Sequence, residues 1–499
     1  MTNSLTRELI TIKNDILKVA LDYGLDPFTT IFELVDYDEL NAVASYGGFP
    51  TRYPHWKFGM EYEELSKTYA YGLQKIYELV INNDPCYAYL MKSNSLIDQK
   101  LVIAHVYAHS DFFKNNMWFS QTNRKMVDEM ANHSTRIRRY ADKHGETEVE
   151  SFIDTCLSLE NLIDTHSMYS VPKSSHSMPS MSVPDTDRIT QPQVVKLKSK
   201  EYMDKYINTP GFMRKQKEKI QEAEDQKKNF PPAPEKDVLK FLIDYAPMRN
   251  WQKDILYTVR EESYYFAPQA MTKIMNEGWA SYWHSKILTQ KVLAANEIID
   301  FADHHSGTVA VSPGRLNPYK LGLEIFRDIE DRWNKGKFGK EYAECDDINK
   351  KRNWNLNLNL GQKKIFEVRK IYNDITFIDE FFTMEFCEKQ KMFAYKLDTA
   401  TNQYVITDRE FEKVKKALLF RLTNMGHPHI AVENGNYKNR GELLLRHYHD
   451  NTELQLDEAI DVMKNIFLIW QRPVNILTIA EGDEKIISYD GQNVKQETI

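Results

Sequence analysis

Apolar positions along most of the chain recur at the spacing of amphipathic helices. Residues 1–28 alternate apolar and charged positions, and helical patterns run from residues 37 to about 140 and again from 237 to about 333. One insert, residues 46–59, is rich in aromatic side chains, and its glycines and prolines prevent a continuous helix. An apolar repeat of three to four residues is typical of helices that bury one face. The larger, N-terminal part of the chain is therefore predicted to be mainly helical.

The pattern changes near residue 364. Short apolar segments separated by turns follow, and the closing sequence predicts a strand at 441–449, a helix at 456–470 and a strand at 473–478. This alternation is typical of an α+β domain.

Two domains are predicted from these patterns: a large, mainly helical domain over residues 1–363 and a smaller α+β domain over residues 364–499. Residues 166–234 begin with a stretch rich in Ser, Met and Pro and continue as a highly charged helical stretch. We interpret them as a surface excursion inside the first domain.

Composition narrows the class of protein. With 42% hydrophobic and 27% charged residues, the 499-residue chain falls in the ordinary globular class. The net charge is -7 and basic residues are scattered among acidic ones, so nucleic acid is not expected as a partner. The four cysteines are far apart, which favours a reducing compartment.

Neither a signal peptide nor a membrane span is expected. Charged residues interrupt the apolar positions of the first 28 residues. The most apolar C-terminal stretch, residues 462–470, is well short of the roughly 20 residues that a bilayer span needs. The predicted location is cytoplasmic.

His105 and His109 stand four residues apart in an apolar stretch. On a helix they share one face, so both imidazoles can reach one metal ion. Packed, hydrogen-bonded histidines are the alternative. The neighbouring Asp111 and Asn115 add polar groups to this apolar segment.

A second motif, MNEGWASYWH at residues 275–284, places Glu277 and His284 seven residues apart on one helical face. A buried glutamate there needs a partner, whereas a solvent-facing glutamate near a helix start is the alternative. With the histidine pair, the motif is similar to a zincin layout, in which one helix supplies His-x-x-x-His and a later helix supplies a glutamate. We predict a zincin-like helical domain in which His105, His109 and Glu277 bind one metal ion, zinc.

The layout departs from zincins at Val106, which occupies the position of the general base. No carboxylate is placed there to deprotonate a metal-bound water, so standard proteolysis is in doubt. Glu160, Glu261 and Glu262 are alternative candidates for the general base, and their spacing along the chain does not favour one over the others. Glu262 and His284 are our candidate catalytic residues.

Other chemistries have less support. A di-iron carboxylate site needs Glu-x-x-His pairs, and neither Glu160 nor Glu277 has a histidine three residues later. The chain contains no Gly-x-Ser-x-Gly elbow, and its glycines follow neither phosphate-loop nor dinucleotide spacing.

Several blocks resemble the stage V sporulation protein R (SpoVR) family: GFPTRYPHWKFGME (48–61), HVYAHSDFFKNN (105–116), MNEGWASYWH (275–284), NPYKLG (317–322) and DIEDRW (328–333). The resemblance implies a cytoplasmic bacterial protein connected with spore cortex formation. It also implies relatives in non-sporulating bacteria that are often encoded beside a PrkA-type serine kinase.

The leading hypothesis is a metal-dependent hydrolase-like protein that makes or modifies cortex peptidoglycan or its precursors. The rival is a non-catalytic regulatory or scaffold protein acting through partners such as that kinase, with the same polar residues in a buried hydrogen-bond network. We also predict that the insert at 46–59, with Arg52 and His55, covers or lines the pocket between the two motif helices.

Overall fold

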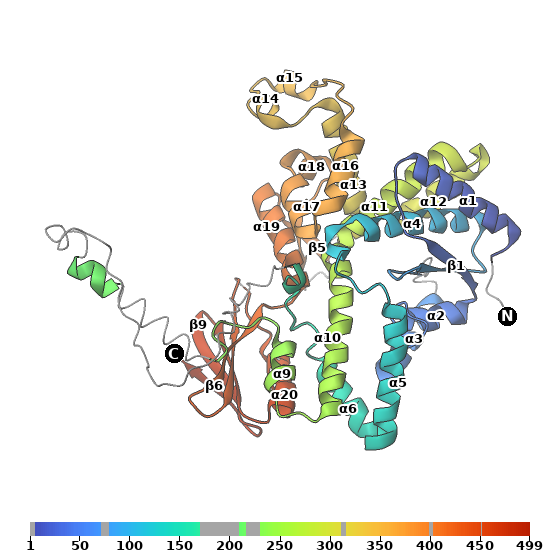
Figure 1. Cartoon of the computed structure of the whole chain (residues 1–499). Helices are drawn as coiled ribbons and strands as arrows, with labels where there is room; N and C mark the ends of the chain where they lie inside the picture. Colours follow the sequence, from blue (N-terminus) through green and yellow to red (C-terminus); the bar gives the residue numbers. More distant parts are fainter. Residues whose placement is uncertain are drawn as a thin grey trace, which may run out of the picture. The chain divides into compact units, whose positions relative to one another are not determined.

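The computed structural model describes residues 5–70, 79–169, 209–215, 230–310, 316–398, 403–450 and 452–499. Two compact units are formed, one by Met1–Glu150 with Tyr264–His427 and the other by Ser151–Ser263 with Pro428–Ile499. The described chain is mainly helical, and its C-terminal region contains a sheet (Figure 1). This much of the predicted fold class is confirmed. The predicted domain boundary near residue 364 stays a prediction.

The first unit is built mainly from helices. Those of its N-terminal half are α1 (Arg7–Asp22), α2 (Tyr37–Ser45), α3 (Trp56–Ala70), α4 (Leu96–Asn115) and α5 (Met126–His144). After α10 (Asn250–Met271), which crosses the division between the units, come α11 (Lys273–Ile287), α12 (Ile298–Thr308), α13 (Pro318–Lys335), α14 (Gly339–Ala343), α15 (Ile348–Arg352), α16 (Gly361–Ile371), α17 (Asp374–Phe381), α18 (Met384–Lys389) and α19 (Phe411–Leu422).

Helix α4 lies in the core of this unit. The Ser95 side chain accepts a hydrogen bond from the backbone N–H of Asp98 and so caps the helix. Every residue from Val102 to Phe113 is buried, as expected for a helix surrounded by other elements on all sides. Its histidines are therefore held inside the protein rather than on its surface.

Helix α11 packs against α4 on one side and against α13 on another (Figure 1). The contact with α13 is very close, because a Cβ atom added to Gly278 would lie 2.4 Å from the backbone of Gly322. Only two glycines permit this approach of two helix backbones. Trp279 and Trp283 of α11 are fully buried and pack against Phe366.

The start of α11 is capped from a distant part of the chain. Thr272 at its N-cap makes no side-chain cap. Instead, the buried carboxylate of Asp374, the first residue of α17, accepts the backbone N–H groups of Ile274 and Met275 at 2.7 and 2.9 Å. These are two of the donors that a helix leaves without an internal partner.

A small mixed sheet corrects the prediction of helix throughout 37–140. Its strands are β1 (Thr30–Val35), β2 (Leu79–Ile81) and β3 (Cys86–Met91), in the order β1-β3-β2, with β1 and β3 parallel. Most of β3 is buried on both faces, and periodicity does not distinguish such a short apolar run from a buried helix segment. The insert at 46–59 is not helical until α3 begins at Trp56. A two-stranded sheet, β4 (Ala394–Asp398) and β5 (Gln403–Asp408), completes the unit.

The second unit contains a five-stranded sheet with the order β10-β9-β8-β7-β6. Its strands are β6 (Ile430–Tyr437), β7 (Glu442–His447), β8 (Val474–Ala480), β9 (Asp483–Tyr489) and β10 (Val494–Thr498), and only β7 and β8 pair in parallel. The unit also includes α9 (Val238–Tyr245) and α20 (Leu456–Trp470), whose Phe241 and Trp470 rings pack 5.7 Å apart. The predicted strand–helix–strand ending is confirmed. Helix α6 (Glu146–Leu157) crosses the division.

Most of the predicted excursion at 166–234 lies outside the described residues. Among the helices of the described part, none combines the length and the apolar character that a membrane crossing requires.

Candidate metal centre

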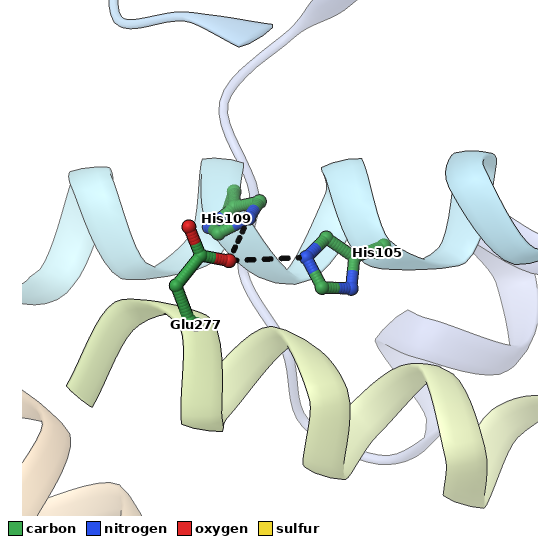
Figure 2. A group of neighbouring side chains, drawn as sticks. All are labelled: His105, His109 and Glu277. Atoms are coloured by element: carbon green, nitrogen blue, oxygen red, sulfur yellow. Dashed lines mark ion pairs between the residues drawn. The ribbon is translucent and has the colours of Figure 1, made fainter. Parts of the chain in front are cut away.

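Three predicted ligands meet between α4 and α11. His105 and His109 are one turn apart on α4, Glu277 lies on α11, and all three side chains are buried. Both Nε2 atoms face the same carboxylate oxygen, Oε2 of Glu277, at 3.5 Å from His105 and 3.4 Å from His109 (Figure 2). One ligand atom from each residue can be chosen so that all three lie within 4.8 Å of one another.

The two Nε2–Oε2 separations fit a small tetrahedral cation. Ligand atoms about 2.1 Å from a zinc ion and at tetrahedral angles are about 3.4 Å from one another. They also exceed the roughly 2.7 to 3.2 Å of a good N–H···O hydrogen bond. Within the described residues, Oε2 of Glu277 accepts no hydrogen bond of conventional geometry. The donor set therefore fits a metal ion better than it fits a closed hydrogen-bond network.

The imidazole of His109 is oriented by the residue next to the third ligand. Its Nδ1 lies 2.8 Å from Oδ1 of Asn276, which precedes Glu277 on α11. An amide oxygen only accepts, so Nδ1 carries a proton, and Nε2 is left to give its lone pair when a metal ion is bound. Nε2 is the atom that faces Glu277. A ligating histidine is commonly held by such a bond from its other ring nitrogen.

The imidazole of His105 is held by other histidines. Its Nδ1 lies 2.7 Å from Nδ1 of His284, and Nε2 of His284 lies 3.0 Å from Nδ1 of His305 on α12. Burial lowers the pKa of His284 well below its ordinary value and lowers the pKa of His305 to about 4. Both rings are therefore neutral near pH 7, and the predicted His284 has both nitrogens engaged.

The charge of Glu277 is balanced by cationic and polar groups. Burial alone would raise the pKa of this carboxyl, but the imidazoles of His105 and His109 and the ammonium of Lys273 hold it well below its ordinary value. Lys273 contacts the other carboxylate oxygen, Oε1, at 2.5 Å. Glu277 is therefore ionised and presents Oε2 toward the histidines.

A buried ion pair fixes α4 against α11 and α16. Asp111, two residues after His109, receives both contacts from one guanidinium nitrogen of Arg369, at 2.5 and 2.6 Å. The same carboxylate accepts the indole N–H of Trp279 at 2.9 Å and the backbone N–H of Asp26 at 2.7 Å. The ion pair and the Trp279 hydrogen bond therefore join the two helices that carry the candidate ligands.

Comparison with known proteins identifies the family. A family model described as SpoVR like protein matches residues 3–427. The chain belongs to the SpoVR-like family. It is also 28% identical over 486 residues to the uncharacterized protein YcgB of Escherichia coli strain K12, with 91% of this chain and 89% of that protein covered. No solved structure matches the chain.

The part that matches the SpoVR-like family includes the three candidate ligands and ends where the first unit ends, at residue 427. The five-stranded sheet of the second unit follows it.

The remaining predicted residues are distributed as follows. Glu262 is buried on α10 and belongs to the second unit, whereas Glu160 and Glu261 are half-buried. Arg52 and His55 are buried in the first unit, where the Arg52 guanidinium lies over the Tyr53 ring. That the insert lines the pocket stays a prediction.

Sequence reasoning missed Lys273 on α11 itself and three contributors from other helices: His305, Arg369 and Asp374. Arg369 and Asp374 are about 90 residues from Glu277 and carry no motif. His305 stands in an acidic, polar segment whose spacing to His284 indicates nothing. Only the packing of α12, α16 and α17 against the motif helices brings them in.

Proposed function

We propose that this chain is a zincin-like, metal-dependent hydrolase-like protein in which His105, His109 and Glu277 hold one zinc ion. The main support for this proposal is that the Nε2 atoms of His105 and His109 lie 3.5 and 3.4 Å from the same buried carboxylate oxygen of Glu277. Two imidazoles and a carboxylate are zinc ligands of catalytic sites that keep one position open for water or substrate.

A zinc ion held by three protein ligands activates water and polarises carbonyl groups. The chain's own residues supply the rest. Val106 is apolar, so the base must come from another element. Glu262 is the base that we propose from the sequence; it is buried, whereas Glu160 and Glu261 are half-buried. For His284 we propose an indirect role in the chemistry, since both ring nitrogens already contact other histidines.

The biological setting follows from the family resemblance. We propose a cytoplasmic role in forming spore cortex peptidoglycan, through precursors or a protein substrate, and a link to a PrkA-type serine kinase. A second candidate function is a non-catalytic regulator or scaffold working through such a partner. The Lys273 contact favours it, because that ammonium already provides a counter-charge for Glu277.

Glu277→Gln separates the two functions. It keeps the shape of the side chain and removes its charge. Under the metal hypothesis, zinc raises the melting temperature of the wild type and has little effect on the variant. A free zinc concentration of 100 times the Kd should stabilise the wild type by about 2.7 kcal/mol. Metal analysis of untagged wild-type protein should give about one zinc per chain.

Glu330→Gln is the matched control. Glu330 also pairs with a lysine, Lys286 at 2.8 Å, and lies on α13 away from the three ligands. Its zinc-dependent shift should equal that of the wild type. If Glu277→Gln changes the melting temperature equally with zinc and with chelator, or if the wild type binds no metal, the metal site is wrong.

A further inference from the structure

Three imidazoles form a continuous chain that begins at the candidate metal ligand His105. The links are 2.7 Å from His105 Nδ1 to His284 Nδ1 and 3.0 Å from His284 Nε2 to His305 Nδ1. His284 is 1% exposed, and His305 is half-buried. The chain therefore leads from the buried site toward a ring that reaches solvent.

Neighbouring contacts hold the outer members of this chain. The His305 ring stacks on Phe301 of the same helix, with centroids 5.5 Å apart and planes at 11°. The adjacent His304 joins α12 to the start of α4 through Asp98 at 2.5 Å. These contacts hold the orientation of the His305 ring and the position of α12.

A neutral imidazole has one N–H and one acceptor nitrogen, so a chain of three has a direction. If Nε2 of His105 gives its lone pair to a metal, its proton is on Nδ1 and is donated to Nδ1 of His284. The proton of His284 is then on Nε2 and is donated to Nδ1 of His305. Each ring's tautomer therefore determines that of the next.

We propose that His284 and His305 are positioning residues that hold His105 in the Nδ1–H tautomer and so direct its Nε2 lone pair toward the metal. This inference rests on the proposed metal site. It assigns a second task to α11, which orients His109 through Asn276 and His105 through His284. The two candidate ligands are held differently. The Asn276 oxygen accepts from His109 without a further partner, whereas His284 accepts from His105 only in the tautomer that its contact with His305 favours.

That dependence provides the test. His284→Leu removes the acceptor for His105, and the zinc Kd, measured by competition with a chromogenic chelator, should rise about 10- to 100-fold. His284→Asn places an amide oxygen near the position of Nδ1 and should restore most of the affinity. His305→Leu should weaken zinc binding in the wild type but not in the His284→Asn background, because an amide oxygen needs no partner to accept. Such non-additivity is the signature of two residues that act in series.

Two controls separate this mechanism from general damage. His427→Asn removes an exposed imidazole of the first unit that is outside the chain, and its zinc Kd should match that of the wild type. Melting temperatures in chelator report folding. His305 is half-buried, so its variant still tests the mechanism if His284→Leu does not fold.

Three outcomes overturn the inference while the wild type binds zinc: unchanged affinity in His284→Leu, equal losses in His284→Leu and His284→Asn, or an equal effect of His305→Leu in both backgrounds. Failure of the wild type to bind zinc has a different meaning, since it overturns the proposed function itself.

Discussion

Replacing Arg369 by Met tests the ion pair that fixes α4 against α11. Met keeps an unbranched side chain in the space of the arginine stem but removes the guanidinium. The carboxylate of Asp111 then retains the N–H groups of Trp279 and Asp26 and loses the cation that pairs with it. Burial raises the pKa of Asp111, and Arg369 opposes that rise. In the variant the pKa therefore rises further.

The loss of unfolding free energy in Arg369→Met has an upper limit that depends on pH. A carboxyl with an ordinary pKa of 3.8 can escape an unfavourable charge by binding a proton, which at pH 7 costs at most about 4 kcal/mol. At pH 5 the same ceiling is about 2 kcal/mol. Measured losses on breaking buried ion pairs, about 3 to 5 kcal/mol, agree with the value at pH 7. Because the pKa of Asp111 in the folded variant is raised above its value in the unfolded chain, the variant loses stability as the pH rises above that unfolded value.

Urea unfolding followed by tryptophan fluorescence, in chelator at pH 5 and pH 7, measures this difference. We expect Arg369→Met to lose about two to three times as much stability at pH 7 as at pH 5. Arg327→Met is the control, because the exposed Arg327 side chain forms an ion pair with Glu324 that should contribute less than about 1 kcal/mol at either pH. A loss that is the same at both pH values, or as small as that of the control, would refute the reasoning.

Two further predictions concern the ends and the contacts of α11. Burial raises the pKa of Asp374 to about 7, so this carboxyl contributes stability at acid pH that is lost as pH rises through about 7. Melting temperatures should therefore show that the wild type loses stability relative to Asp374→Asn between pH 5 and pH 8, and parallel curves would contradict this. Gly278→Ala should cost about 3 kcal/mol or more, because its Cβ would meet the Gly322 backbone rather than a movable side chain. Gly59→Ala on α3, where nothing lies within 4 Å, is the control in the same unfolding assay and should be neutral or stabilising.

Helical periodicity and local spacing predicted the C-terminal elements and part of the candidate metal site. The helix predicted at 456–470 is α20, and the pattern of strand, helix and strand around it is present. The two histidines could be paired from their spacing, because a helix places residues four apart on one face, and Glu277 was added through the similarity of its motif to a zincin layout. Both signals are local, so the sequence alone was enough to find them.

Short buried strands and distant partners were not predictable in this way. The run at 86–91 is apolar throughout, so its strand identity depends on pairing with β1, more than fifty residues earlier. Arg369 and Asp374 reach α4 and α11 only through the packing of α16 and α17. The residues around Arg369 and Asp374 in the sequence form no motif that predicts these contacts.

The sequence by itself determined which residues are capable of binding a metal: two imidazoles on one helical face and one carboxylate on another helix. Tertiary structure decided that both Nε2 atoms face one carboxylate oxygen and that His284 and His305 continue from His105. The physical reason is that spacing fixes which side chains share a face of one helix, whereas the distance between two helices depends on contacts such as Gly278 with Gly322.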